Sequence, residues 1–319
     1  MPVSGVRHIQ VASEYEGQRL DNFLLRELKG LPRTRVYRLL RQGQVRVNGG
    51  RVRPEYRLRR GDRLRLPPMR LQERELGGAP SARILQRIEQ AILYENEQLL
   101  ILDKPSGLAV HGGSGLAYGV IEAIRARRPG TLPLDLAHRL DRDTSGCLII
   151  AKRRETLRQI HALMRSNRVE KRYLALLRGK LASAMRVEAP LERRPGQGLL
   201  QPVQVSIGGR QALTVFHPIE RHRGWTLVDV MLHTGRMHQI RVHAAYSGYP
   251  VAGDARYGDP QANRTLRRFG LRRLFLHASR VAFALPGQDK LVVQAALSEE
   301  LAAVLQYLRE NASAEGGAR

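Results

Sequence analysis

Residues 138–151 place a highly charged loop directly before a short apolar segment, and this juxtaposition constrains the fold more than any other part of the chain. The loop reads His138-Arg139-Leu140-Asp141-Arg142-Asp143-Thr144-Ser145-Gly146 and ends in residues that favour turns. Residues 147–151 follow at once and are short and branched enough to form a buried strand. A carboxylate on a loop fixed against a core strand is held rigidly, as a nucleophile or general base must be. A surface salt-bridge cluster beside a turn is the simpler interpretation of the charges alone.

The charge of the chain indicates a polyanionic partner. The 319 residues are enough for one large and one small domain, and the formal net charge is +25. No apolar run approaches the roughly 20 residues that span a bilayer, and the N-terminus has no signal-peptide core, so nucleic acid is favoured over a membrane. The single cysteine, Cys147, excludes intrachain disulfides and cysteine-based metal sites, which fits a location in the reducing cytoplasm.

Residues 14–68 are predicted to form a compact basic module. Apolar residues at helical spacing predict one helix over residues 20–28, Thr34 is a plausible cap for a second helix, and Asn48-Gly49 indicates a hairpin. Residues 1–68 contain 16 arginines and lysines against six acids, a surplus of +10 in about a fifth of the chain. The module therefore concentrates positive charge on a small fold.

Four arginines of this module are candidate RNA contacts. Arg35, Arg38 and Arg41 lie three apart on one side of the second helix, and Arg46 lies on the hairpin. A solvated basic face is the alternative interpretation of such a row. Two helices followed by a small basic hairpin resemble the alpha-L RNA-binding module first seen in a small-subunit ribosomal protein.

The remainder of the chain predicts a linker and then an α+β domain. Pro67-Pro68, Gly77-Gly78 and Pro80 indicate a linker over residues 69–88. Several successive predicted strands lack an intervening helix, which favours a mainly antiparallel mixed sheet over a doubly wound one. The domain is expected to span residues 89–310, with a disordered tail at 311–319. We predict strands at 99–102, 147–151, 173–177, 213–216, 226–232 and 291–293, and helices at 119–127, 155–166, 236–246 and 298–310.

Two further segments carry candidate site residues. Tyr173 is expected to open a strand, where taken alone it is an ordinary half-buried tyrosine. Thr234 is a plausible cap for a helix on which His238 and Arg241 share a face. A buried carboxylate without a partner is costly, so a reactive Asp141 needs a cation beside it.

The string HRLDRDTSG resembles the catalytic signature of the pseudouridine synthases of the large-subunit rRNA type. The resemblance implies that Asp141 is the catalytic aspartate and that Arg241 pairs with it. It places Tyr173, in a K-x-Y motif, against the target uracil, where it would stack and take part in proton transfer. It extends over the chain from residue 17 to residue 310.

The resemblance implies isomerisation of uridine to pseudouridine in 23S rRNA, with no cofactor and no metal. The target uridine must leave the duplex, and Arg139 would fill the vacated space. The remaining candidate RNA contacts around the cleft are His138, Arg236 and His238. The order of modules is most similar to the branch of the family that modifies uridines in and near the peptidyl-transferase region, and we expect a monomer.

Three alternatives remain open. A sister branch with the same architecture acts on another 23S rRNA stem-loop. A non-catalytic rRNA-binding assembly factor would use the same basic surface. Glycoside hydrolysis by paired carboxylates would need a second acid, for which Asp143 is the candidate, although its position beside Thr144-Ser145 suggests turn capping. Zinc catalysis is disfavoured because the pairs His238/His243 and His217/His222 lie five residues apart, not four.

Overall fold

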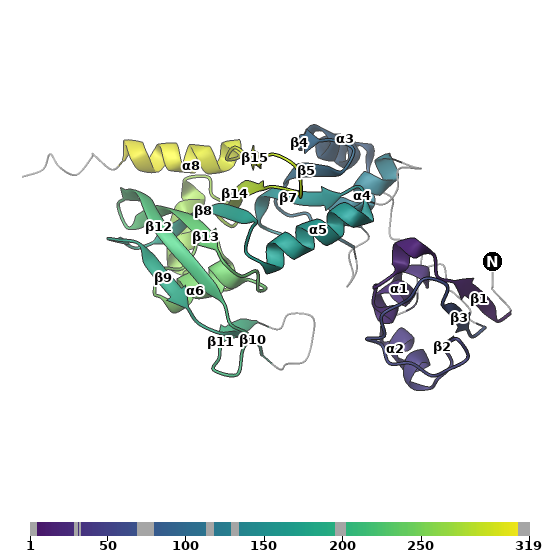
Figure 1. Ribbon diagram of the computed structural model, residues 1–319. Coiled ribbons are helices and arrows are strands. Elements are labelled where there is room, and N and C mark those ends of the chain that lie inside the picture. The colour runs from purple at the N-terminus through teal and green to yellow at the C-terminus, as the bar shows by residue number, and fades with distance from the viewer. Residues whose placement is uncertain are drawn as a thin grey trace, which may run out of the picture. The chain divides into compact units, whose positions relative to one another are not determined.

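A computed structural model describes residues 5–28, 31, 33–68, 80–112, 118–128, 134–194 and 202–311. The chain divides into two compact units, Met1–Gly78 and Ala79–Arg319, and each is described by itself (Figure 1). Residues 69–79 of the expected linker and residues 312–319 of the expected tail lie outside the described residues.

The first unit packs two helices against a three-stranded antiparallel sheet of order β1-β3-β2. Its apolar residues are spaced so that one side of each helix is buried, and Phe23, Leu24 and Val36 are at most 1% exposed. The unit therefore has a core of its own. Its elements are β1 (Arg7–Gln10), a short 3-10 helix (Ser13–Tyr15), α1 (Leu20–Glu27), α2 (Arg33–Arg41), β2 (Arg46–Val47) and β3 (Arg63–Leu66).

Two details of the first unit test the sequence predictions. Asn48 and Gly49 both have positive φ (48° and 81°), as a two-residue hairpin turn requires, so the predicted turn is confirmed. The strand β2 nevertheless pairs mainly with β3, which lies far along the chain. The second helix begins at Arg33, so the prediction of Thr34 as its cap is wrong: Thr34 lies in the first turn of the helix.

The second unit is built on a ten-stranded mixed sheet (Figure 1). Its main path is β4-β5-β7-β14-β8-β13-β12-β9, with β15 beside β14 and β6 beside β7. Among the described strand pairs of this sheet, only β7–β14 is parallel, so the predicted mainly antiparallel α+β fold is confirmed. The strands of this sheet are β4 (Ile92–Glu95), β5 (Leu99–Lys104), β6 (Asp135–Leu136), β7 (Ser145–Ala151), β8 (Glu170–Arg178), β9 (Met185–Glu188), β12 (Leu213–His222), β13 (Trp225–Leu232), β14 (Leu276–Phe283) and β15 (Leu291–Gln294).

Helices cover both faces of this sheet. Alternate side chains of its strands face opposite ways, so Leu148 packs in the cluster that includes α3 and α4, while Ile149 packs in the cluster that includes α5. Further along the sheet, α6 packs on the first cluster and α8 on a cluster around Leu176. A separate two-stranded sheet joins β10 (Leu191–Arg193) to β11 (Val203–Val205). The helices are α3 (Ala82–Gln90), α4 (Val120–Arg127), α5 (Arg154–Arg165), α6 (Gln239–Tyr246), α7 (Pro260–Arg268) and α8 (Glu299–Glu310).

The parallel contact between β7 and β14 brings two backbones unusually close. Gly146 has φ +107°, and a Cβ at this position would lie 2.3 Å from the carbonyl oxygen of Ala278. Only glycine fits such an approach. The turn that carries Asp141 is thereby fixed to the middle of the sheet.

Several element boundaries differ from the predictions; for example, β12 runs to His222 and does not end at residue 216. Helix α3 occupies the second half of the expected linker, and its Ile88 is buried in the core, so residues 82–88 belong to the second unit. Strand β8 begins at Glu170, which places Tyr173 inside the strand. Helix α6 begins at Gln239, three residues after the predicted start at 236. Among the described residues, no helix has the length and apolar character needed to cross a membrane.

Candidate active site

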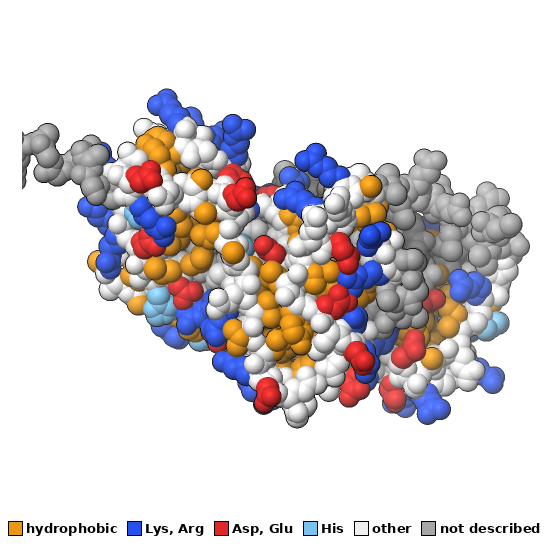
Figure 2. Space-filling view, turned by 90° about the horizontal axis from the view of Figure 1, so that it is seen from above, with side chains coloured by type: hydrophobic (Ala, Val, Ile, Leu, Met, Phe, Trp, Pro, Cys, Tyr) orange, Lys and Arg blue, Asp and Glu red, His pale blue; other side chains and the backbone are white. Residues whose placement is uncertain are grey.

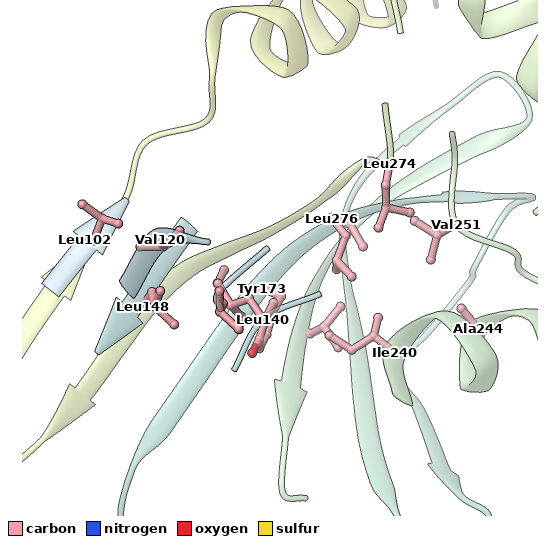
Figure 3. Close-up of a cluster of buried hydrophobic side chains, with 14 of the residues drawn as sticks. Leu102, Val120, Leu140, Leu148, Tyr173, Ile240, Ala244, Val251, Leu274 and Leu276 are labelled. Carbon is pink, nitrogen blue, oxygen red and sulfur yellow. The ribbon is translucent and has the colours of Figure 1, made fainter. Parts of the chain in front are cut away.

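Asp141 lies on a loop that packs against the hydrophobic core through the neighbouring residue. Its neighbour Leu140 is 4% exposed and packs in the same cluster as Tyr173 and Ile240 (Figure 3). The side chain of Asp141 remains 19% exposed, so the carboxylate reaches the surface of a site whose base is apolar. This is a rigid and accessible carboxylate.

The loop after β5 forms hydrogen bonds with the backbone of the loop that carries Asp141, called the aspartate loop below. Lys104 is fully buried, and its Nζ donates to the carbonyl oxygens of Pro105, Leu108 and Arg142 at 2.8–2.9 Å. The backbone N–H of Gly107 also donates to the carbonyl oxygen of Arg142, at 2.9 Å. Burial lowers the pKa of Lys104 to about 7. The lysine thus ties together two loops that are 38 residues apart.

Arg241 lies beside Asp141 but has a second and closer partner. Its Nη1 is 3.4 Å from Asp141 Oδ2, whereas Nε and Nη2 donate to the two oxygens of Asp254 at 2.6 and 2.8 Å. Burial of Arg241 by itself lowers its pKa, but the hydrogen bonds and charge of Asp254 reverse this, and the net pKa is raised. The side chain of Asp254 is fully buried. Sequence reasoning assigned no role to Asp254, because it lies 13 residues from Arg241 in a segment without a distinctive charge pattern.

His238 completes the polar side of the site in an unusual backbone conformation. It precedes α6 with φ +54°, in the left-handed region, so the prediction that it lies within a helix is wrong. Its Nδ1 is 2.8 Å from the hydroxyl of Tyr257, and its Nε2 is 3.9 Å from Asp141 Oδ2. Burial lowers the pKa of His238, although Asp141 acts in the opposite direction. His238 and Arg241 therefore do approach the same carboxylate, by a different local structure from the predicted one.

A buried glutamine explains the late start of α6. Gln239 Oε1 accepts from Thr234 Oγ1 at 2.7 Å and from the backbone N–H of Arg236 at 3.0 Å. Its Nε2 donates to Leu213 and Thr214 on β12. These bonds hold residues 234–238 as a turn. Arg236 is exposed, and its Nε donates to the carbonyl oxygen of Gln211 at 3.1 Å.

Tyr173 lies at the bottom of the site. It is 6% exposed, and Figure 3 shows it beside Leu140. Burial raises the pKa of its hydroxyl above the ordinary value, and the charge of Asp141 raises it further. The phenol is therefore neutral at physiological pH.

The arginines around Asp141 are exposed. Arg139 and Arg142 both lie on the surface of the loop. The Nε of Arg142 is 3.4 Å from Asp143 Oδ1, and the Asp143 side chain is 52% exposed. The carboxylate of Asp143 thus lies beside Arg142, and the turn itself is closed by the backbone N–H of Thr144 donating to the carbonyl of Asp141 at 3.2 Å.

His138 is half-buried and bonded to β7, whereas a surface position is expected of an RNA contact. Its Nε2 accepts a hydrogen bond from the backbone N–H of Ile149 at 3.1 Å. Burial lowers the pKa of His138 to about 4, and nearby Lys171 lowers it further. The neutral ring ties the start of the loop to β7, so the geometry favours a supporting role.

The four arginines of the first unit are on its surface. Arg35, Arg38 and Arg41 are exposed along α2, and Arg46 is exposed on β2. Figure 2 shows Lys and Arg side chains scattered among acidic, neutral and apolar ones.

The remaining titratable groups support no metal site among the residues that the structure describes. These residues contain no cluster of three or more His, Cys, Asp or Glu side chains placed to hold an ion. Cys147 is buried in β7, and burial raises the pKa of its thiol to about 12. It is a core residue of the strand and not a reactive thiol.

Comparison with known families gives two matches within this chain. The model of a family described as RNA pseudouridylate synthase matches residues 98–246, and the model of the S4 domain matches residues 18–64. The first range includes Asp141, Tyr173 and Arg241, and the second includes the four arginines of the first unit.

Curated relatives match nearly the whole chain. Ribosomal large subunit pseudouridine synthase C of Haemophilus influenzae is 46% identical over 313 residues, which are 97% of each chain. The protein of the same name from Escherichia coli K12 is also 46% identical, over 95% of this chain and 97% of its own. Among solved structures, human RNA Pseudouridylate Synthase Domain Containing 4 aligns with a TM-score of 0.59 and 26% identity, over 71% of this chain and 96% of that one.

Proposed function

Because the chain belongs to the RNA pseudouridylate synthase family, we propose that it isomerises uridines of large-subunit ribosomal RNA to pseudouridine. The names of its relatives support the substrate, and the S4 domain match supports RNA binding. The observation that carries the proposal is the environment of Asp141. This accessible carboxylate lies on a rigid loop, 3.4 Å from a guanidinium and beside a buried tyrosine.

The reaction exchanges one bond to the ribose for another within the same nucleotide. The bond from N1 of uracil to C1′ breaks, the base rotates, and C5 bonds to C1′, while C5 loses a proton and N1 gains one. Atoms and electrons balance without a redox partner or a group donor. The residues must therefore bind, orient and move protons, with Asp141 either attacking the sugar or taking a ribose proton.

Three residues divide this work. Asp141 is the essential carboxylate. Arg241, itself fixed by Asp254, keeps that carboxylate ionised and oriented in a partly buried site. Tyr173 supplies a flat apolar surface for the extruded uracil, and its neutral hydroxyl is available for proton transfer.

RNA recognition uses both units. The exposed Arg139 enters the space that the extruded uridine leaves, and the exposed arginines of α2 and β2 contact phosphates. The target uridines lie in or near the peptidyl-transferase region, and the enzyme acts as a monomer in the cytoplasm. Chemical mapping of pseudouridines in 23S rRNA from a strain lacking the gene would identify them; loss at another stem-loop would point to the sister activity.

The direct test is Asp141→Asn, which keeps the shape of the side chain and removes its charge. We expect rRNA binding near that of the wild type and no pseudouridine formation by the purified variant. Asp143→Asn, an exposed acid two residues away, is the matched control and should remain active. Measurable modification by Asp141→Asn would exclude this carboxylate as the catalytic group, and full function in cells would favour an assembly factor.

A further inference from the structure

A pocket of about 450 Å³ opens at one end of the strands of the large sheet. It lies where α5 ends, where β8 begins and where β13 and β14 end. Its volume lies in the range of roughly 300–1,000 Å³ that is typical of small-molecule sites. Its apolar floor is formed by Leu163, Met231, Leu232 and Phe283.

Two chain segments run from the lining of this pocket to residues of the candidate site. Lys171 lines it and lies two residues before Tyr173 on the same face of β8, a distance of about 7 Å along the strand. His233 also lines it and leads straight into the turn that carries His238. Along β8, the pocket therefore begins about 7 Å from Tyr173.

Lys171 is the most informative residue in the pocket. It is only partly exposed, and no described residue accepts a hydrogen bond from it or forms an ion pair with it. An ammonium withdrawn from water without a partner is costly, which indicates an anion that binds there. The pocket's one acid, Glu170, does not serve this purpose, because its carboxylate is already shared by Arg172, Arg280 and Lys290.

We propose that this pocket receives the nucleotide next to the target uridine in the substrate strand. Its base lies on the apolar floor, and the phosphate that links it to the target accepts from Lys171. An apolar surface for a base beside a cation for the backbone is the combination that single-stranded RNA requires. The proposal rests on the uridine isomerase function and adds a second contact that fixes which uridine enters the site.

The test compares three versions of a 23S rRNA stem-loop that carries one mapped target uridine. One is intact, and the other two lack the base on the 5′ or the 3′ side of the target. With the wild type, we expect loss of one of these bases, but not the other, to lower the single-turnover rate about tenfold when enzyme is in excess of RNA but below saturation. A wild type that modifies no version would contradict the isomerase function itself.

Two variants locate that effect in the pocket. Ala284 is exposed at the rim, so Ala284→Trp fills the pocket from outside the core. This variant should modify the intact stem-loop about tenfold more slowly than the wild type does, and loss of the base should not lower its rate further. Ala302→Trp, an exposed change on α8, is the control for added bulk and should behave as the wild type.

Lys171→Met should weaken substrate binding without changing the rate at saturation, and Lys171→Arg should restore part of the binding. The proposal is overturned if neither missing base slows the wild type. It is equally overturned if Ala284→Trp remains as sensitive to the missing base as the wild type, since the base would then be recognised elsewhere.

Discussion

At the scale of single residues, the charge balance around Asp141 is set by a residue that never faces the substrate. Asp254 accepts two hydrogen bonds from Arg241 and two more from the backbone N–H groups of Arg256 and Tyr257. These interactions hold the pKa of Asp254 below its ordinary value in spite of its burial. The arginine is thus placed before the RNA arrives, and only its third nitrogen is left for Asp141.

Asp254→Asn should therefore impair both stability and turnover. The substitution removes the carboxylate charge that pairs with the buried guanidinium of Arg241, and breaking a buried ion pair lowers the free energy of unfolding by about 3–5 kcal/mol. Urea unfolding measures the first effect, and the single-turnover rate measures the second. A variant as stable and as fast as the wild type would show that Asp141 alone suffices to hold Arg241.

Arg139 offers a test of base extrusion. Arg139→Ala should slow the modification of structured rRNA far more than that of a flexible, unpaired oligonucleotide with the same uridine, because an inserted side chain offsets part of the unstacking cost. Single-turnover rates on both substrates measure the difference, with Arg142→Ala as the control for loss of an exposed charge. Equal slowing on the two substrates would leave Arg139 as a phosphate contact or a support of the loop.

At the scale of elements, the position of the aspartate loop depends on one glycine. Gly146→Ala should destabilise the protein by about 3 kcal/mol or more, because the added Cβ meets the backbone of Ala278 and the positive φ is strained. Thermal unfolding measures the loss, and Gly224→Ala is a control with positive φ but open space around its Cβ. If the two variants lose the same stability, strain alone and not the β7–β14 contact explains the glycine.

The sequence predicts elements well where the periodicity is local and poorly where distant contacts decide. The apolar run after Gly146 and the spacing in α5 and α8 are sufficient to predict those elements. The start of α6 is not predictable, because Gln239 bonds to β12, about 25 residues away. In the candidate site, sequence motifs predict Asp141, Tyr173 and Arg241. The role of Asp254 is evident only from the folded structure.

At the scale of the whole molecule, positive charge is concentrated toward the N-terminus. Residues 1–78 carry 18 basic and eight acidic residues, a surplus of +10. Their removal leaves the second unit with its motifs, and we expect weaker rRNA binding with a flatter dependence on salt, because fewer phosphate contacts release fewer counterions. Binding measured from 50 to 200 mM salt tests this; an unchanged slope would assign these residues to folding or assembly.

The order of strands in the large sheet also belongs to this scale. Strand β14 lies between β7 and β8, although it follows them by more than 90 residues. No local pattern specifies such a pairing, and only the class of the sheet, mixed and mainly antiparallel, follows from the succession of strands. The two units, by contrast, are separable in the sequence because proline and glycine cluster between them.

Because the Cys147 thiol is buried, its reaction with a thiol reagent can report local opening of the protein. Cys147 is the single cysteine of the chain, and it lies in β7 one residue beyond the glycine that fixes the aspartate loop. An alkylating reagent can reach it only when the middle of the sheet opens, so the labelling rate counts those openings. Comparing the labelling rate with and without substrate RNA would then show whether bound RNA suppresses opening of the sheet beside this loop.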